Sequence, residues 1–187
     1  MDAVAHALQK HRLLLQQDPR LPSVAGLIAG EPLRGAWWSH PKGQEIFKRL
    51  RQLEDDDAVL VTRLVSAKVT YVHKTLWPAF LGVATSHTSW QLDGLSSAAS
   101  KLLASAPTRA KGDAVRELQA RLLVAANEVH TESGKHAIEI EAWTAWAKRN
   151  RAVPMKDVEA AMGELERAVV HYGAAVSSLP WHKGKAR

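Results

Sequence analysis

The densest group of side chains suited to catalysis or metal binding lies in the string HTESGKH, residues 130–136. His130, Glu132 and His136 are ligand types that divalent transition metals accept, and His40 or His73 could supply a third imidazole. The spacing matches neither H-E-x-x-H nor another recognised metal motif. These residues remain candidates for an enzyme or metal site, which is the alternative to the binding function developed below.

A structural interpretation of the same string competes with the metal site. Thr131 or Ser133 can cap a helix, and Gly134 can adopt the left-handed conformation that ends one. We favour this helix break and expect neither a bound metal nor another cofactor.

Other signatures of catalysis are missing from the sequence. There is no G-x-S-x-G elbow, no Walker A motif and no G-x-G-x-x-G string. The chain has no cysteine, which excludes disulfides, thiolate nucleophiles and cysteine-ligated zinc. The sequence therefore favours a binding protein over an enzyme.

Positive charge is concentrated in the middle of the chain. The net charge is +6, and residues 58–112 hold six lysines and arginines against the single acidic residue Asp93. A local surplus of this kind indicates a surface that faces a polyanion, although a solvated basic face is an equal alternative. The predicted nucleic-acid contacts are Arg34, Trp38, His40, Lys42, Arg63, Lys68, Thr70 and Lys74.

Two adjacent tryptophans precede the basic segment. Trp37 and Trp38 could stack on bases, because every base has an aromatic face. The alternative, which we favour, is that one fills the core and the other anchors a loop, since tryptophan is mostly buried.

Hydrophobic periodicity predicts a largely helical first half. A helix is expected over residues 2–17, ending at Asp18-Pro19, and a second over 23–29 with Ser23 as N-cap and Gly30 as its end. Pro41 suits the first position of a third helix, which runs to residue 53. Its predicted buried residues are Ile46, Phe47, Leu50 and Leu53.

A β-hairpin is expected next, because residues 58–65 and 68–74 are rich in Val, Thr and Tyr. Ser66-Ala67 is the predicted turn. If Val65 lies opposite Lys68, Leu60 and Tyr71 share the packed face. The other face is then basic, with Arg63, Lys68, Thr70 and Lys74.

The second half is predicted to be helical. Helices are expected over 76–84 and 96–106, from 111 to about 129, over 137–148 and from Pro154 onward, and the sequence shows no internal repeat. The alternation of Ile138 and Ile140 with Glu139 and Glu141 leaves a short strand open. The predicted fold is α+β and mostly helical, with winged-helix-like helices, one hairpin and C-terminal helices. We expect a domain over 1–110, a packed helical part over 111–179 and a basic tail over 180–187.

Three strings carry a resemblance to a known family: GAWWSHPKGQEIF from Gly35, VLVTRLVSAKVTYVHKTLWPA from Val59 and VHTESGKH from Val129. Over roughly residues 20–150 the chain resembles small bacterial and fungal proteins related to alkylpurine DNA glycosylases. The resemblance implies winged-helix elements and contact with DNA. The glycosylases use a glutamine–apolar–glutamine motif that this sequence lacks, so no catalytic residue carries over and no base excision is expected.

The predicted function is binding of nucleic acid, specifically duplex DNA, with a connection to DNA repair. A protein-interaction module that uses the last helix and tail is a third hypothesis, and a homodimer would form through the C-terminal helices. Charges interrupt the apolar residues of the N-terminal segment, so neither a signal peptide nor a membrane contact is expected. The expected location is cytoplasmic.

Overall fold

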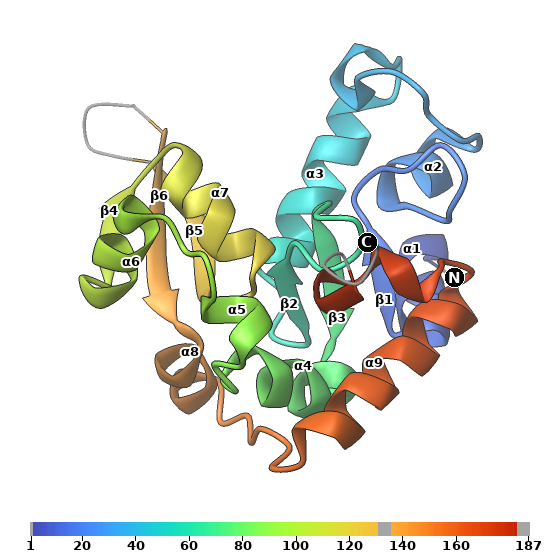
Figure 1. The fold of residues 1–187 in the computed structure, drawn as a ribbon. Coiled ribbons are helices and arrows are strands. Elements are labelled where there is room, and N and C mark those ends of the chain that lie inside the picture. The colour runs from blue at the N-terminus through green and yellow to red at the C-terminus, as the bar shows by residue number, and fades with distance from the viewer. Residues whose placement is uncertain (1, 131–135, 183–187) are drawn as a thin grey trace.

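The computed structural model describes residues 2–130 and 136–182, an α+β arrangement around two small antiparallel sheets (Figure 1). Its α-helices are α1 (Ala3–His11), α2 (Val24–Ala29), α3 (Gly43–Glu54), α4 (Trp77–Ala84), α5 (Ser89–Leu92), α6 (Ser97–Ala104), α7 (Asp113–Ala120), α8 (Trp143–Arg149) and α9 (Val158–Tyr172). Its strands are β1 (Leu13–Leu15), β2 (Val59–Thr62), β3 (Thr70–His73), β4 (Thr108–Ala110), β5 (Val124–His130) and β6 (His136–Ala142). Short 3-10 segments are η1 (Trp37–Ser39), η2 (Lys74–Leu76), η3 (Val176–Ser178) and η4 (Pro180–His182). No described helix has the length and apolar character of a transmembrane span.

The first sheet has the order β1–β3–β2, and its first strand corrects the predicted helix over 2–17. That helix ends at His11, where Arg12 adopts a left-handed conformation with φ of 62°. Leu13, Leu14 and Leu15 are each 0% exposed and pair with β3. A strand buried on both faces shows no polar–apolar alternation, so these leucines resemble a helical stripe in the sequence.

The hairpin of β2 and β3 contains the predicted turn. Ser66 and Ala67 have φ of 53° and 57°, and the Lys68 amide donates to the Val65 carbonyl over 2.9 Å. Positive φ at both central residues is the geometry of a type I′ turn, whose twist suits a two-residue hairpin. The turn is confirmed, although the paired strands are shorter than predicted.

The pairing register of this hairpin differs from the predicted one by one residue. Leu60 lies opposite Val72, so residues 63–65 precede the turn where only 68–69 follow it. The additional residue is a bulge. A shift of one residue moves every side chain of β3 to the other face, and Tyr71 therefore does not share the face of Leu60.

Helices enclose the first sheet. The packing pairs are α3 with β2, α1 with β1 and β3, α4 with α9, and α9 with β1. Tyr172 attaches α9 to the sheet, because its hydroxyl accepts from the Leu15 amide at 3.1 Å and donates to the Pro22 carbonyl. The apolar face of α9, which was expected to support a homodimer, thus packs within the chain.

The second sheet replaces two predicted helices. The helix expected over 111–129 ends at Ala120 as α7, Leu122 takes φ of 54°, and β5 begins at Val124. Residues 137–142, expected as the start of a helix, lie in β6, which pairs with β5 and β4 to give the order β4–β6–β5. The alternation of Ile138 to Glu141 is therefore a strand pattern.

The helices and strands that form the two sheets follow one another in the same order along the chain. Each begins with a helix and a strand, continues through one or more helices, and ends with a hairpin whose last strand pairs with the first strand. The first unit is α1–β1–α2–α3–β2–β3, and the second is α6–β4–α7–β5–β6. The topology therefore repeats where the sequence showed no repeat, and the single hairpin that was predicted is one of two.

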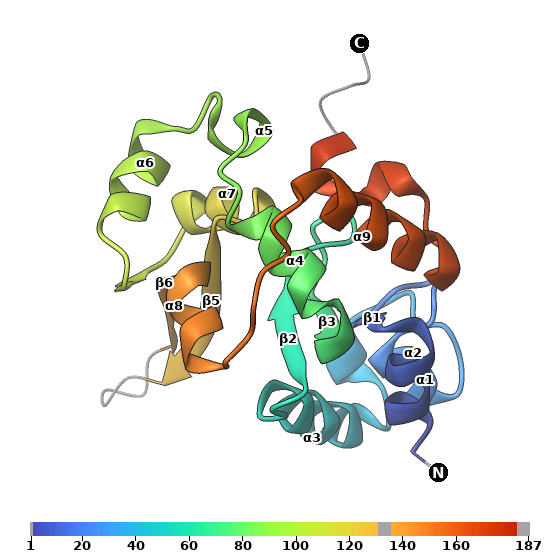
Figure 2. The same cartoon turned by 90° about the horizontal axis from the view of Figure 1, so that it is seen from below.

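The two units lie side by side in both views (Figures 1 and 2), and aromatic side chains join α4, which follows the first unit, to α8, which follows the second. The Phe80 ring of α4 lies edge-on to Trp143 of α8, with centroids 4.8 Å apart, and Trp77 lies edge-on to Trp146 at 5.0 Å. The boundary predicted at residue 110 falls at the end of β4, which pairs across it with β6. The predicted tail 180–187 begins with η4, in which Trp181 is buried.

Candidate nucleic-acid interface

The eight predicted contact residues fall into two groups in space. Arg34, Trp38, His40 and Lys42 lie on the loop between α2 and α3. Arg63, Lys68, Thr70 and Lys74 lie in or beside the β2–β3 hairpin. The two groups have different surroundings, and only the first presents an open basic surface.

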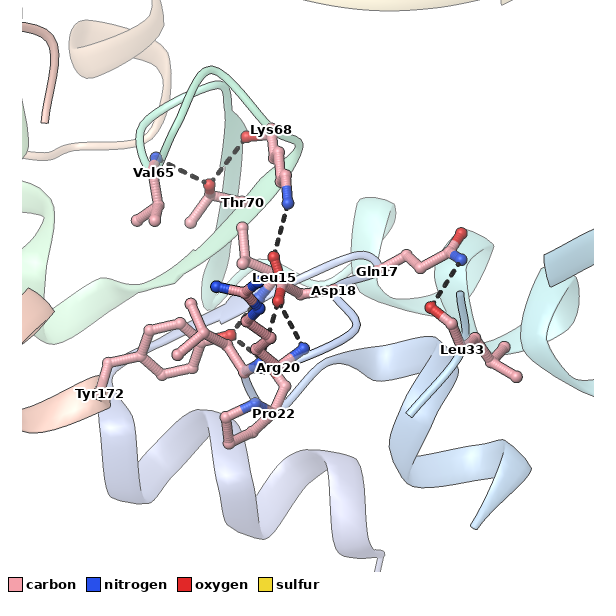
Figure 3. A network of polar contacts seen from close by, with 11 residues as sticks. Leu15, Gln17, Asp18, Arg20, Pro22, Leu33, Val65, Lys68, Thr70 and Tyr172 are labelled. Carbon is pink, nitrogen blue, oxygen red and sulfur yellow. Dashed lines mark hydrogen bonds and ion pairs between the residues drawn. The ribbon is translucent and has the colours of Figure 1, made fainter. Parts of the chain in front are cut away.

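Most of the hairpin group is engaged within the protein (Figure 3). Lys68 reaches the carboxylate of Asp18, with Nζ 2.6 Å from Oδ2. Thr70 is 0% exposed, and its hydroxyl accepts from the Val65 amide and donates to the Lys68 carbonyl. Arg63 donates to the Ala67 carbonyl over 3.3 Å. Thr70 therefore faces the interior, and the predicted basic face does not exist as a continuous surface, because the register is shifted by one residue.

The hairpin tip is also attached to the C-terminal segment. The Ser66 amide donates to the Ser178 carbonyl over 2.8 Å. Among the four hairpin residues, only Lys74 is an exposed cation without an internal partner in the described structure.

Asp18 is the centre of the contacts that hold this hairpin. It is 7% exposed and accepts from the amides of Arg20 and Leu21 at 2.8 and 3.0 Å, in addition to Lys68. Burial by itself would raise the pKa of Asp18, but the hydrogen bonds from Lys68, Arg20 and Leu21 outweigh it, and the pKa lies below its usual value. The carboxylate form therefore stabilises the fold.

Replacing Asp18 with asparagine is expected to lower the free energy of unfolding at neutral pH by about 1 kcal/mol, because the ion pair with Lys68 is lost and Lys68 is half exposed. A depressed pKa contributes stability above the unfolded value of 3.8 and loses it as the pH falls through the folded value. The difference in free energy of unfolding between the parent and Asp18→Asn should be constant from pH 7 to 5 and shrink below about pH 4. Urea unfolding across this range measures it. The control is Asp113→Asn, at an exposed aspartate, and a difference independent of pH would contradict the assignment.

The loop before α3 is held by hydrogen bonds from side chains to backbone carbonyls. Gln17 donates through Nε2 to the Leu33 carbonyl over 3.3 Å (Figure 3), and also to the Gly35 carbonyl. The Lys42 ammonium donates to the Ile28 carbonyl over 2.7 Å. These bonds connect the loop to the segment after β1 and to α2.

His40 has a structural place in this loop. Its Nδ1 accepts from the Lys42 amide at 3.2 Å, its carbonyl accepts from the Gly43 amide at 2.7 Å, and its Nε2 lies 3.8 Å from Glu31. The helix begins at Gly43, two residues after the predicted Pro41 position. His40 thus shapes the entry to α3 and is only half exposed.

Two large aromatic rings are exposed at the start of α3. Trp38 is 71% exposed, and Phe47, predicted as a core residue, is 56% exposed. The inward face of α3 is formed by Gly43, Ile46, Leu50 and Leu53. One residue beyond Ile46 is a rotation of about 100° on a helix, which takes Phe47 out of the core. Trp37 is half-buried against the core, as expected for one of the pair.

These rings line a shallow cavity, here called the aromatic pocket, of about 530 Å³. It is lined by Trp37, Trp38, Gly43, Gln44, Phe47 and Lys48. Phe47, Gln44 and Lys48 were not predicted as site residues. The sequence did contain a signal that Phe47 lies off the buried face, because Ile46 and Phe47 are adjacent and cannot both lie at the centre of one helical stripe.

Three cations on α3 or the loop before it have no described carboxylate partner, and one of them, Lys48, lines the aromatic pocket. Lys48 and Arg34 are exposed and make no ion pair with a described residue, and the partner of Lys42 is a neutral carbonyl. By contrast, Arg49 pairs with Asp2, and Arg51 pairs with Glu54 at 2.7 Å. Arg34 also lines a second shallow cavity together with Arg20. Arg34, Lys42 and Lys48 therefore carry positive charge that is not paired with a described carboxylate.

The metal candidates are not brought together by the described residues. Glu132 lies outside the described residues, as does the predicted helix break at Gly134, and only the backbones of His130 and His136 are described, in β5 and β6. His73 interacts with Thr75, with Nδ1 3.0 Å from Oγ1. Within residues 2–130 and 136–182, no three His, Cys, Asp or Glu side chains are grouped to hold a metal.

Comparison of the whole chain with protein-family models, with curated proteins and with solved structures finds no match. The function must therefore be argued from the residues of the site itself.

Proposed function

We propose that this protein binds duplex DNA through the α3 surface, which comprises Arg34, Trp38, Lys42, Phe47 and Lys48. The observation that carries the proposal is that Lys42 and Lys48 at the start of α3, and Arg34 in the loop before it, have no carboxylate partner in the described chain. Arg34 and Lys48 make no side-chain bond in the described chain, and Lys42 is bonded only to a neutral carbonyl, so these cations can contact phosphates and release the counterions that surround DNA. Phosphate contacts of this kind position a protein on a duplex without reading its sequence.

The order of elements gives independent support. In the first unit a helix and a strand precede α2 and α3, and a hairpin follows whose last strand pairs with β1. This is the order of elements in winged-helix proteins, which present the second helix of the pair to the major groove. On this basis α3 would be the recognition helix, and its exposed side chains would face the DNA.

The hairpin has a smaller part in this proposal than the sequence suggested. Lys68 is paired with Asp18, and the turn is bonded to Ser178. Lys74 is the hairpin residue that remains available for a phosphate. We therefore place the principal contacts on α3 and its preceding loop.

The double variant Arg34→Ala/Lys48→Ala tests the proposal. Neither side chain makes a hydrogen bond within the described chain, so the fold should be unaffected. Affinity for a short duplex is expected to fall about tenfold at moderate salt. The slope of the logarithm of affinity against that of salt concentration should become shallower by about 1.8, because each phosphate contact contributes about 0.9. Fluorescence anisotropy at several salt concentrations measures both quantities.

The matched control is Lys156→Ala/Arg167→Ala, which removes the same charge from exposed positions near and on α9. It should change affinity by less than twofold. Equal losses in the two double variants would show that only net charge matters, and no binding by the parent protein at low salt would refute DNA binding.

A further inference from the structure

The aromatic pocket carries exposed rings, which contacts with phosphates alone do not require. Trp38 and Phe47 are exposed rings that border one cavity, whereas the other large exposed apolar residues in the described chain are aliphatic. They are Leu92, Val153 and Val170. Exposed apolar clusters on a protein surface mark binding sites.

The tryptophan side of the pocket is supported by the core through Trp37. Trp37 packs against the core and lies edge-on to Trp38, with centroids 5.7 Å apart and an interplanar angle of 80°. Gly43 allows the loop to pack closely against α3, since a Cβ at this position would lie 2.9 Å from the Trp38 carbonyl oxygen. A wall that is ordered before binding loses little conformational entropy when a ligand stacks on it.

The chemistry of the lining selects the kind of ligand. Aromatic rings present flat faces, Gln44 carries an amide that can both donate and accept, and Lys48 carries a positive charge. No carboxylate from the described residues lines the pocket. A flat heteroaromatic group with hydrogen-bonding edges and a neighbouring negative charge satisfies all three features, and a nucleotide is such a group.

We infer that the aromatic pocket receives an unstacked base, so that the protein prefers DNA containing an unpaired nucleotide over fully paired duplex. The inference rests on the proposed function and specifies its substrate class. A base inside a duplex is stacked on both faces, so its flat surfaces are covered. An extrahelical base can stack on Trp38 or Phe47 while Lys48 contacts the adjoining phosphate.

The test compares two probes that differ in one nucleotide: a short fully paired duplex and the same duplex with a single bulged adenosine. The parent protein should bind the bulged probe about tenfold more tightly, as expected for one stacked base. Trp38→Ala and Phe47→Ala should each reduce this preference to about twofold or less, because each lowers affinity for the bulged probe by a larger factor than affinity for the paired duplex. Trp38→Phe keeps an aromatic face and should retain most of the preference.

Two controls separate the possible failures. Leu92→Ala removes an exposed apolar side chain elsewhere and should keep the full preference. Arg34→Ala/Lys48→Ala should still weaken binding of the paired duplex, independently of the result obtained with the bulged probe. Binding to both probes with equal affinity would overturn this inference alone, whereas no binding to either would refute the proposed function as well.

A protein partner is the remaining outcome. If the parent protein self-associates in sedimentation experiments and Trp38→Ala abolishes that association while the preference for the bulged probe is absent, the pocket is a protein contact. That result would overturn the inference.

Discussion

Replacing Phe80 with alanine is expected to lower the free energy of unfolding by about 4 kcal/mol. Phe80 is 0% exposed, and its ring lies edge-on to Trp143 at 4.8 Å and 80°. The substitution removes a buried ring from α4 and leaves Trp143 of α8 facing a cavity, so both the transfer free energy and the aromatic contact are lost. Urea unfolding followed by tryptophan fluorescence measures the change.

The same substitution at Phe47 is the matched control. Phe47 is 56% exposed, so Phe47→Ala should change the free energy of unfolding by about 0.5 kcal/mol or less. The comparison also tests the correction made to the predicted core of α3. Similar losses at both positions would contradict the burial of Phe80 in the contact between α4 and α8.

Replacing Gly82 with alanine is expected to destabilise the protein by about 3 kcal/mol, although alanine is the better helix former. A Cβ at Gly82 would lie 2.8 Å from the Met155 carbonyl oxygen and 3.2 Å from the Ala161 Cβ. The Met155 backbone is held by its amide, which donates to the Pro78 carbonyl over 2.8 Å. Removing the close contacts of the added Cβ would therefore require α4 and α9 to move apart. Thermal and urea unfolding provide the measurement.

Gly163 in α9 provides the opposite case. The nearest atom to a Cβ at that position is the Arg167 Nη1 at 3.4 Å, the end of a flexible side chain. Gly163→Ala should therefore stabilise the protein by about 0.5–1 kcal/mol through helix propensity. A stabilising Gly82→Ala would show that the contact between α4 and α9 can relax.

Local signals in the sequence were sufficient for several elements. Ser23 caps α2 by accepting from the Gly26 amide at 3.1 Å, and Gly30 ends it with φ of 86°, as predicted. The Ser66–Ala67 turn is likewise confirmed. Caps and turns depend on residues within a few positions of one another, so a single sequence contains what determines them.

The candidate site was predicted only in part. The loop residues Arg34, Trp38 and Lys42, which were predicted, belong to the proposed α3 surface, whereas Phe47 and Lys48 were missed. Lys68 and Thr70 are engaged inside the chain. Whether a lysine is available to a ligand depends on the carboxylates near it in space. Asp18 lies 50 positions from Lys68, and their pairing leaves no signal in the local sequence.

The sequence by itself determined the α+β class, the position of the first hairpin and the basic, tryptophan-bearing loop before α3, because these follow from periodicity, turn chemistry and composition. Only the tertiary structure decided that Leu13–Leu15 is a strand and that β5 and β6 form a second hairpin. It also decided which cations stay unpaired. Strand pairing and ion pairing join residues that are distant along the chain, and burial on both faces removes the alternation by which a strand is recognised. The repeated order of the two sheets is therefore visible in three dimensions and not in the amino acids.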